Sequence, residues 1–298
     1  MLHSAQLARQ QRLDVLAMHL RPSRLPRICD VGANPIYGTT IYKPLLQRRL
    51  CEVYGFEPEP EAYRQCCERA SDLETYFPVA VGAPGRRTFN VHKLSCLSSL
   101  FRISQKALRE LGYPANWAKP SFISQIEIEA VALDDVPDLP PLDLMKADVE
   151  GAELEIILSG RQKLSTAVAI VAEVNFFQFY EGAPMFADVD RAMGDLGYRL
   201  HRFIGWNRFL VPSASMWAPG LSGNQVINAD AAYIRQGDYA TLFNDDQIAF
   251  TALAADVMFD SPDLTLRCLD ILYDRGAVTR QALEHYSAAL QGTFGQLR

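Results

Sequence analysis

Apolar runs and amphipathic stretches alternate from residue 27 to residue 204. Short apolar runs over 27–31, 51–57, 142–148 and 167–174 are typical of strands. The last of these is apolar almost throughout, as in a strand whose two faces are both covered. Helical spacing follows the runs, over the stretch from Gly38 to about Arg49 and over 60–70, 151–160 and 185–197. Repeated strand–helix units predict an α/β fold with a doubly wound, mostly parallel sheet.

Five further segments have the pattern of strands. Residues 76–81 form a short apolar run between turn signals, and 87–93 and 126–133 alternate with a period of two, as half-buried strands do. Segments 198–204 and 225–235 complete the set. A loop-rich stretch over 94–124 interrupts the alternation, and loops of this length often cover a substrate site.

Both ends of the chain are predicted to be helical. Near the start, Leu13, Leu16 and Leu20 share one helix face after Ser4, a suitable N-cap. This arginine-rich stretch also has the composition of a mitochondrial presequence, but we favour a helix that covers the core. Apolar stripes over 250–257, 264–272 and 283–290 predict three helices near the end. The predicted division is 1–26, a helical segment; 27–237, the α/β domain; and 238–298, a helical extension.

Composition narrows the class of protein. The chain carries a net charge of −6 without basic blocks, which argues against a nucleic-acid partner. No apolar run approaches the roughly 20 residues of a membrane span. The six cysteines include no C-x-x-C pair, so we expect buried thiols in a reducing, cytoplasmic protein.

The loop after the first strand has the features of a nucleoside site. Asp30 ends an apolar run, Gly32 and Gly38 bracket a loop, and Glu57 ends the next strand. Glycines allow a ligand to approach the backbone closely, and a distal carboxylate accepts hydrogen bonds from a ribose diol. Because a dinucleotide loop needs a third glycine and an acid suits a sulfonium, the pattern favours S-adenosylmethionine (SAM). A nicotinamide-dependent oxidoreductase is the alternative.

Further acids fall at strand ends, where ligands gather in such sheets. Asp148 is the first candidate for a general base or for a group that orients a methyl acceptor, and Glu150 and Glu173 are the other candidates. The same three carboxylates are an alternative set of ligands for a divalent metal, which we do not favour.

Several motifs together resemble the FkbM family of SAM-dependent methyltransferases. They are Asp30–Asn34, Gly55–Pro58, Val79–Gly82, Leu97–Leu100, Asp143–Glu153 and Ala172–Val174, and the resemblance covers residues 27–204. It implies a Rossmann-like methyltransferase sheet with an antiparallel C-terminal strand, and methyl transfer to a hydroxyl of a sugar, glycolipid or other metabolite. The expected cofactor-binding residues are Asp30, Gly32, Ala33, Asn34, Tyr37, Gly38, Glu57, Pro58, Ala80, Val81 and Asp148. The sequence departs from the family pattern at Pro35–Tyr37 and Ala147.

The expected partner is therefore a small-molecule or glycan acceptor. The C-terminal helices lie outside the family pattern and are candidates for contact with a second copy or another protein. A partner-binding protein that keeps the fold without catalysis is the remaining alternative.

Overall fold

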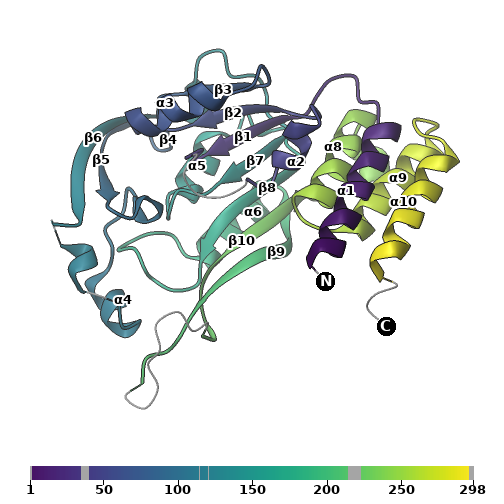
Figure 1. Ribbon diagram of the computed structural model, residues 1–298. Coiled ribbons are helices and arrows are strands. Elements are labelled where there is room, and N and C mark those ends of the chain that lie inside the picture. The colour runs from purple at the N-terminus through teal and green to yellow at the C-terminus, as the bar shows by residue number, and fades with distance from the viewer. Residues whose placement is uncertain (1, 35–39, 114, 120, 214–222, 295–298) are drawn as a thin grey trace.

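The computed structural model describes residues 2–34, 40–113, 115–119, 121–213 and 223–294. Its main sheet has seven strands in the order β3-β2-β1-β7-β8-β10-β9 (Figure 1). The strands are β1 (Arg27–Val31), β2 (Glu52–Phe56), β3 (Glu74–Phe77), β7 (Leu144–Ala147), β8 (Ala169–Asn175), β9 (Tyr198–Phe209) and β10 (Gln225–Arg235).

The predicted fold class is confirmed. The pairs β1–β2, β2–β3, β1–β7 and β7–β8 are parallel. Strand β10 runs antiparallel between β8 and β9. Strand β8 is buried along its whole length, as its apolar sequence predicts.

A smaller sheet of three strands lies beside the main one. It consists of β4 (Ala80–Val81), β5 (Gly85–His92) and β6 (Ile123–Val131), with β6 in the middle. The single strand predicted over 76–81 is wrong, because the chain leaves the main sheet after Phe77 and pairs Ala80 with Ala130 of the second sheet. Pro78 stands at this break, and proline has no N–H to continue a ladder.

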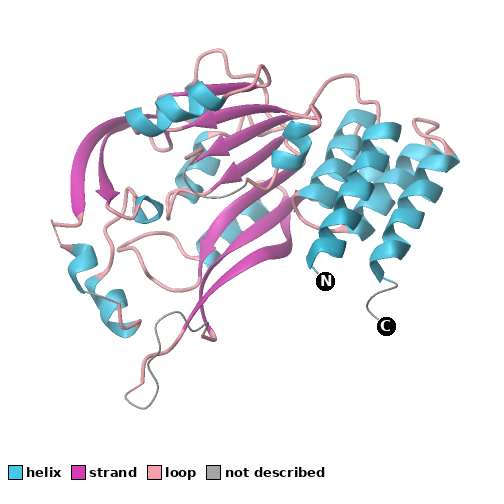
Figure 2. Cartoon of the chain, in the orientation of Figure 1, coloured by secondary structure: helices cyan, strands magenta, loops and turns pink. Residues whose placement is uncertain are grey.

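Helices cover both faces of the main sheet (Figure 2). One face packs against α5 (Glu153–Ser159) and α6 (Phe186–Asp195), through side chains such as Ile156 and Met193. The other packs against α1 (Leu2–His19), α2 (Lys43–Gln47), α8 (Asp245–Val257), α9 (Pro262–Asp274) and α10 (Arg280–Phe294). The shorter helices are α3 (Pro60–Arg69), α4 (Gln105–Glu110) and α7 (Tyr239–Leu242), with 3-10 turns at Ser95–Leu97, Ala115–Ala118 and Leu133–Asp135.

Two helix boundaries differ from the predicted ones. The helix predicted from Gly38 to Arg49 is shorter, because α2 begins at Lys43 and Arg49 adopts φ 57°, which does not continue a helix. Residues 35–39 lie outside the described part of the chain. The predicted cap at Ser4 is also wrong, since α1 begins at Leu2 and includes Ser4.

The N-terminal helix and the C-terminal helices pack together as one bundle at the right of Figure 1. Arg12 of α1 donates to Asp256 of α8 at 2.6 Å, and Tyr286 of α10 donates to the same carboxylate. The bundle shares a core with the sheet, through Ile28, Leu144 and neighbours. The division at residues 26 and 237 therefore stays a prediction about sequence segments.

The cysteine prediction is correct in part. Cys29, Cys51, Cys66 and Cys268 are buried, but Cys67 and Cys96 are exposed. Cys67 follows Cys66 on α3, and consecutive helical residues point about 100° apart, so both cannot face the core. Across the described residues, no helix combines the length and apolarity needed to cross a membrane.

Candidate active site

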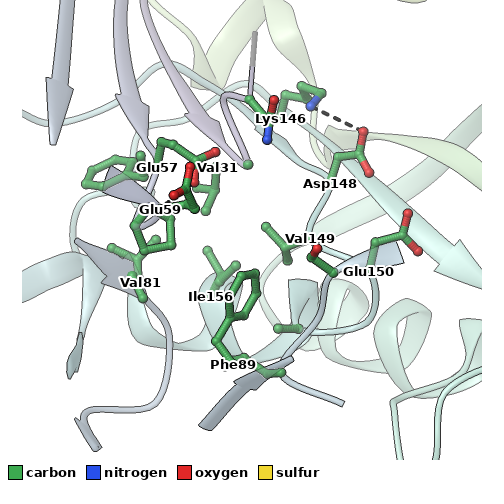
Figure 3. A pocket seen from close by; sticks show the side chains of 18 of the residues that line it. Val31, Glu57, Glu59, Val81, Phe89, Lys146, Asp148, Val149, Glu150 and Ile156 are labelled. Atoms are coloured by element: carbon green, nitrogen blue, oxygen red, sulfur yellow. Dashed lines mark hydrogen bonds and ion pairs between the residues drawn. The ribbon is translucent and has the colours of Figure 1, made fainter. Parts of the chain in front are cut away.

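A cavity of about 450 Å³ opens where β1, β2 and β7 end. Its size is within the usual range of small-molecule sites, about 300–1,000 Å³. Figure 3 shows Asp148 and Glu150 across the cavity from Glu57. Apolar side chains from both sheets, from adjoining loops and from α5 line much of the rest: Val31, Phe56, Val79, Ala80, Val81, Phe89, Val91, Ile128, Val149 and Ile156.

Gly32 allows the first loop to meet the end of β7. It adopts φ 84°, and a Cβ there would lie 2.2 Å from the carbonyl oxygen of Asp148. The backbone N–H of Asp148 donates to the carbonyl of Val31 at 3.1 Å. A side chain at position 32 would therefore push the two loops apart, so glycine is required here.

Asp30 lies behind the cavity wall. It is 1% exposed, and its carboxylate accepts a hydrogen bond from the Tyr42 hydroxyl at 2.5 Å. Lys146, its register partner on β7, lies 3.4 Å from it. The same ammonium lies 3.4 Å from Asp148 and lines the cavity. The sequence analysis assigned no role to Lys146. A lysine inside a buried central strand needs an acidic partner, and this requirement could have indicated its pairing with nearby acids.

Glu57 lines the cavity on the side of β2. It is 5% exposed, and it accepts a hydrogen bond from the backbone N–H of Glu59 at 2.9 Å. Burial raises the pKa of the Glu57 carboxyl to about 7. A buried acid with spare acceptor capacity, at the end of β2, has the placement that a ribose diol requires.

Several hydrogen bonds fix the acidic loop after β7. Glu150 adopts φ 59°, a strained conformation for a residue other than glycine, and Gly151 follows with φ 111°. Glu153 accepts hydrogen bonds from the N–H groups of Val149 at 2.8 Å and of Gly151 at 3.0 Å. The Ser99 hydroxyl donates to the carbonyl of Glu150 at 2.6 Å. Ser99, noted in the sequence only as part of a motif, therefore holds the acidic loop in place.

Three carboxylates converge at this loop. One oxygen each of Asp148, Glu150 and Glu173 lies within 4.8 Å of the others. Glu150 accepts from the Tyr180 hydroxyl at 3.0 Å, and Glu173 from the side-chain amide of Asn228 at 2.6 Å. Burial raises the pKa of Glu150 to about 8 and that of Glu173 well above its ordinary value, and neighbouring acids add to both shifts.

The predicted site residues divide into three groups. The residues that line the cavity are Gly32, Asn34, Glu57, Pro58, Ala80, Val81, Asp148 and Glu150. Asp30 and Ala33 are buried next to the wall, and Glu173 lies behind Asp148 and Glu150. Tyr37 and Gly38 lie outside the described residues. The individual roles of all these residues stay predictions.

Comparison with known proteins identifies the family. The model of the methyltransferase FkbM domain matches residues 30–200, more than half of the chain. The chain belongs to the FkbM methyltransferase family. The matched segment is thus a SAM-dependent methyltransferase domain, as its motifs suggested.

The FkbM chain is also similar to the 2-O-methyltransferase NoeI of Sinorhizobium fredii, with 28% identity over 163 residues. The alignment covers 53% of this chain and 66% of that relative. Among solved structures, it is similar to a precorrin-6y C5,15-methyltransferase from Geobacter metallireducens, at 11% identity and a TM-score of 0.35 over 75% of this chain and 88% of that one. The chain is also similar to magnesium protoporphyrin IX methyltransferase from Synechocystis PCC 6803, at 13% identity and a TM-score of 0.33 over 78% of this chain and 79% of that one.

Proposed function

We propose that this protein transfers a methyl group from SAM to a hydroxyl of a sugar, glycolipid or other hydroxylated metabolite. One observation carries the proposal: a single cavity has the buried carboxylate of Glu57, our candidate ribose ligand, on one side and the acids Asp148 and Glu150 on the other. A methyltransferase needs both elements together, one to hold the nucleoside and one to meet the acceptor.

The residues around the cavity fit SAM. Glu57 offers a carboxylate to the ribose diol, and the apolar wall that includes Ala80 and Val81 suits a purine ring. Gly32 leaves backbone close to the cavity without a side chain in the way. When bound, SAM supplies a methyl carbon activated by a positively charged sulfur.

Asp148 is the first candidate for the group that meets the acceptor. Its side chain is 43% exposed, whereas Glu173 is buried, so an incoming hydroxyl can reach Asp148 first. A carboxylate there orients the hydroxyl and accepts its proton as the new bond forms. Lys146 of β7 forms an ion pair with Asp148 at 3.4 Å.

The relative NoeI supports oxygen as the methylated atom, because its name describes a 2-O-methyltransferase. The alignment covers 66% of NoeI, just under two thirds of its length, and the acceptor class is therefore part of the proposal. The oxidoreductase alternative does not agree with membership of a methyltransferase family.

A methyl-transfer assay tests the proposal. Purified protein is incubated with methyl-labelled SAM and a panel of mono- and oligosaccharides, glycolipids and hydroxylated metabolites, and labelled products are identified by mass spectrometry. We expect an O-methylated product and a loss of about 10²–10⁴-fold in turnover for Asp148→Asn, the usual contribution of a general base. The exposed Glu181→Gln is the matched control and should keep full turnover.

Two results would overturn the proposal. Label found on nitrogen or carbon would exclude O-methylation. SAM binding without transfer to any acceptor of the panel or of a cell extract would favour the non-catalytic alternative.

A further inference from the structure

We propose that Asp148, Glu150 and Glu173 bind one divalent cation of the Mg²⁺ or Mn²⁺ type at the edge of the cavity. This inference rests on the proposed function, because the cation would stand where the acceptor hydroxyl arrives. The sequence analysis did not favour a metal at these three acids; the proposal here assigns them the role of metal ligands.

The spacing of the three carboxylates suits one ion. Their nearest oxygens lie within 4.8 Å of one another. Oxygen ligands stand about 2.0–2.6 Å from Mg²⁺ or Ca²⁺, so two ligands of one ion are at most about 4–5 Å apart. The cluster therefore needs only small side-chain movements to enclose a cation.

A buried oxygen without a donor points independently to a ligand. Glu173 is 7% exposed, and its Oε1 accepts from Asn228 while its Oε2 has no hydrogen-bond partner. The side-chain oxygen of Asn228 on the adjacent strand is also buried and without a partner. A buried acceptor left unpaired is costly, and a cation at this position would satisfy it.

The surrounding charges favour a cation as well. Three carboxylates meet here, and Asp230 lines the same cavity. In the described part of the chain, Lys146 is the basic side chain paired with this group, and it is shared with Asp30. One shared ammonium cannot balance all of these acids when they ionise, and hard oxygen ligands select hard divalent ions.

The arrangement leaves room for a substrate oxygen. Asp148 and Glu150 line the cavity (Figure 3), whereas Glu173 belongs to strand β8 and is not among the lining residues. Coordination positions not used by the protein would therefore face the cavity. A hydroxyl bound there would be oriented and made more acidic by the cation.

Binding of Mn²⁺ alone provides the test. Protein treated with EDTA and then desalted is titrated with Mn²⁺, and free Mn²⁺ is counted by electron paramagnetic resonance. We expect one bound ion per chain in the wild type and a loss of at least about tenfold in affinity in Glu173→Gln and in Asp148→Asn. Glu181→Gln, exposed and outside the cluster, should bind like the wild type.

Thermal unfolding separates a lost site from a lost fold. Glu173→Gln keeps the side-chain volume and removes a buried acid whose ionisation is opposed by burial and by neighbouring acids, so its metal-free melting temperature should equal or exceed that of the wild type. Mn²⁺ should raise the melting temperature of the wild type and not of Glu173→Gln. Equal Mn²⁺ binding by the wild type and both variants, or no binding by the wild type, would overturn the inference.

SAM titrated into the metal-free protein distinguishes the two proposals. Binding of SAM and methyl transfer without any Mn²⁺ binding would refute only the cation. Absence of SAM binding would refute the proposed function, whatever the metal result.

Discussion

Two groups of buried ionisable side chains in this protein are built in opposite ways. In the helical bundle, Arg12 and Asp256 are each 2% exposed, and the pair is completed by the Tyr286 hydroxyl. At the cavity, Glu57 and Glu173 are nearly as buried, and the neighbours that shift their pKa values are mainly other acids. A buried charge with its partner holds elements together, whereas buried acids without a matching cation are typical of ligand-binding and catalytic sites.

The substitution with the largest expected effect breaks the buried ion pair of the helical bundle. Arg12→Ala leaves Asp256 buried without its cation between α1, α8 and α10. We expect a loss of about 3–5 kcal/mol in the free energy of unfolding, measured with urea. Arg9→Ala is the matched control on the same helix, because Arg9 is 56% exposed in its ion pair and should contribute about 0–1 kcal/mol.

Equal stabilities of these two variants would contradict the comparison. The bundle would then be held by its apolar core alone, and the buried ion pair would be incidental to it.

The next expected effect concerns the buried acid Glu57 at the cavity, which makes the stability of the protein depend on pH. The pKa of Glu57 is raised from 4.5 to about 7 by burial, so folding favours its neutral form. The unfolded chain releases the Glu57 proton at a lower pH than the folded chain does. The contribution of neutral Glu57 to stability is therefore fully present below about pH 4.5 and is lost as the pH rises towards 7. We expect the ligand-free wild type to lose about 2–3 kcal/mol more than Glu57→Gln between pH 4.5 and pH 8.

Urea unfolding at several pH values measures this difference, and other titrating groups cancel because both proteins share them. A wild type and a Glu57→Gln variant with parallel pH profiles would show that Glu57 is not held neutral in the folded protein.

The sequence predicts the sheet well because strand and helix periods are local properties. The apolar run of β8 and the acids at the ends of β1, β2 and β7 could be read directly. The departure of β4 from the main sheet could not, because it depends on pairing with β6 fifty residues later in the chain. The packing of α1 on α10 joins the two ends of the chain and is equally invisible to a local pattern.

The same distinction applies to the site. Glu57 and Asp148 stand at strand ends, which a pattern can find. The pairing of Lys146 with Asp30 depends on strand register. The hydrogen bond from the Ser99 hydroxyl to the Glu150 carbonyl depends on how a long loop returns to the sheet. These contacts also explain why Asp30, expected at the cofactor, lies buried behind the wall.

Calorimetric titration of SAM into the wild type and Glu57→Gln, at pH 8, tests the central claim most directly, because only binding in this cavity involves that carboxylate. We predict that SAM binds the wild type and that Glu57→Gln weakens binding by about 1–3 kcal/mol, or roughly 5–150-fold, the contribution of a charge-assisted hydrogen bond. Equal affinities, or no binding to the wild type, would show that the cavity at the ends of β1, β2 and β7 is not the cofactor site.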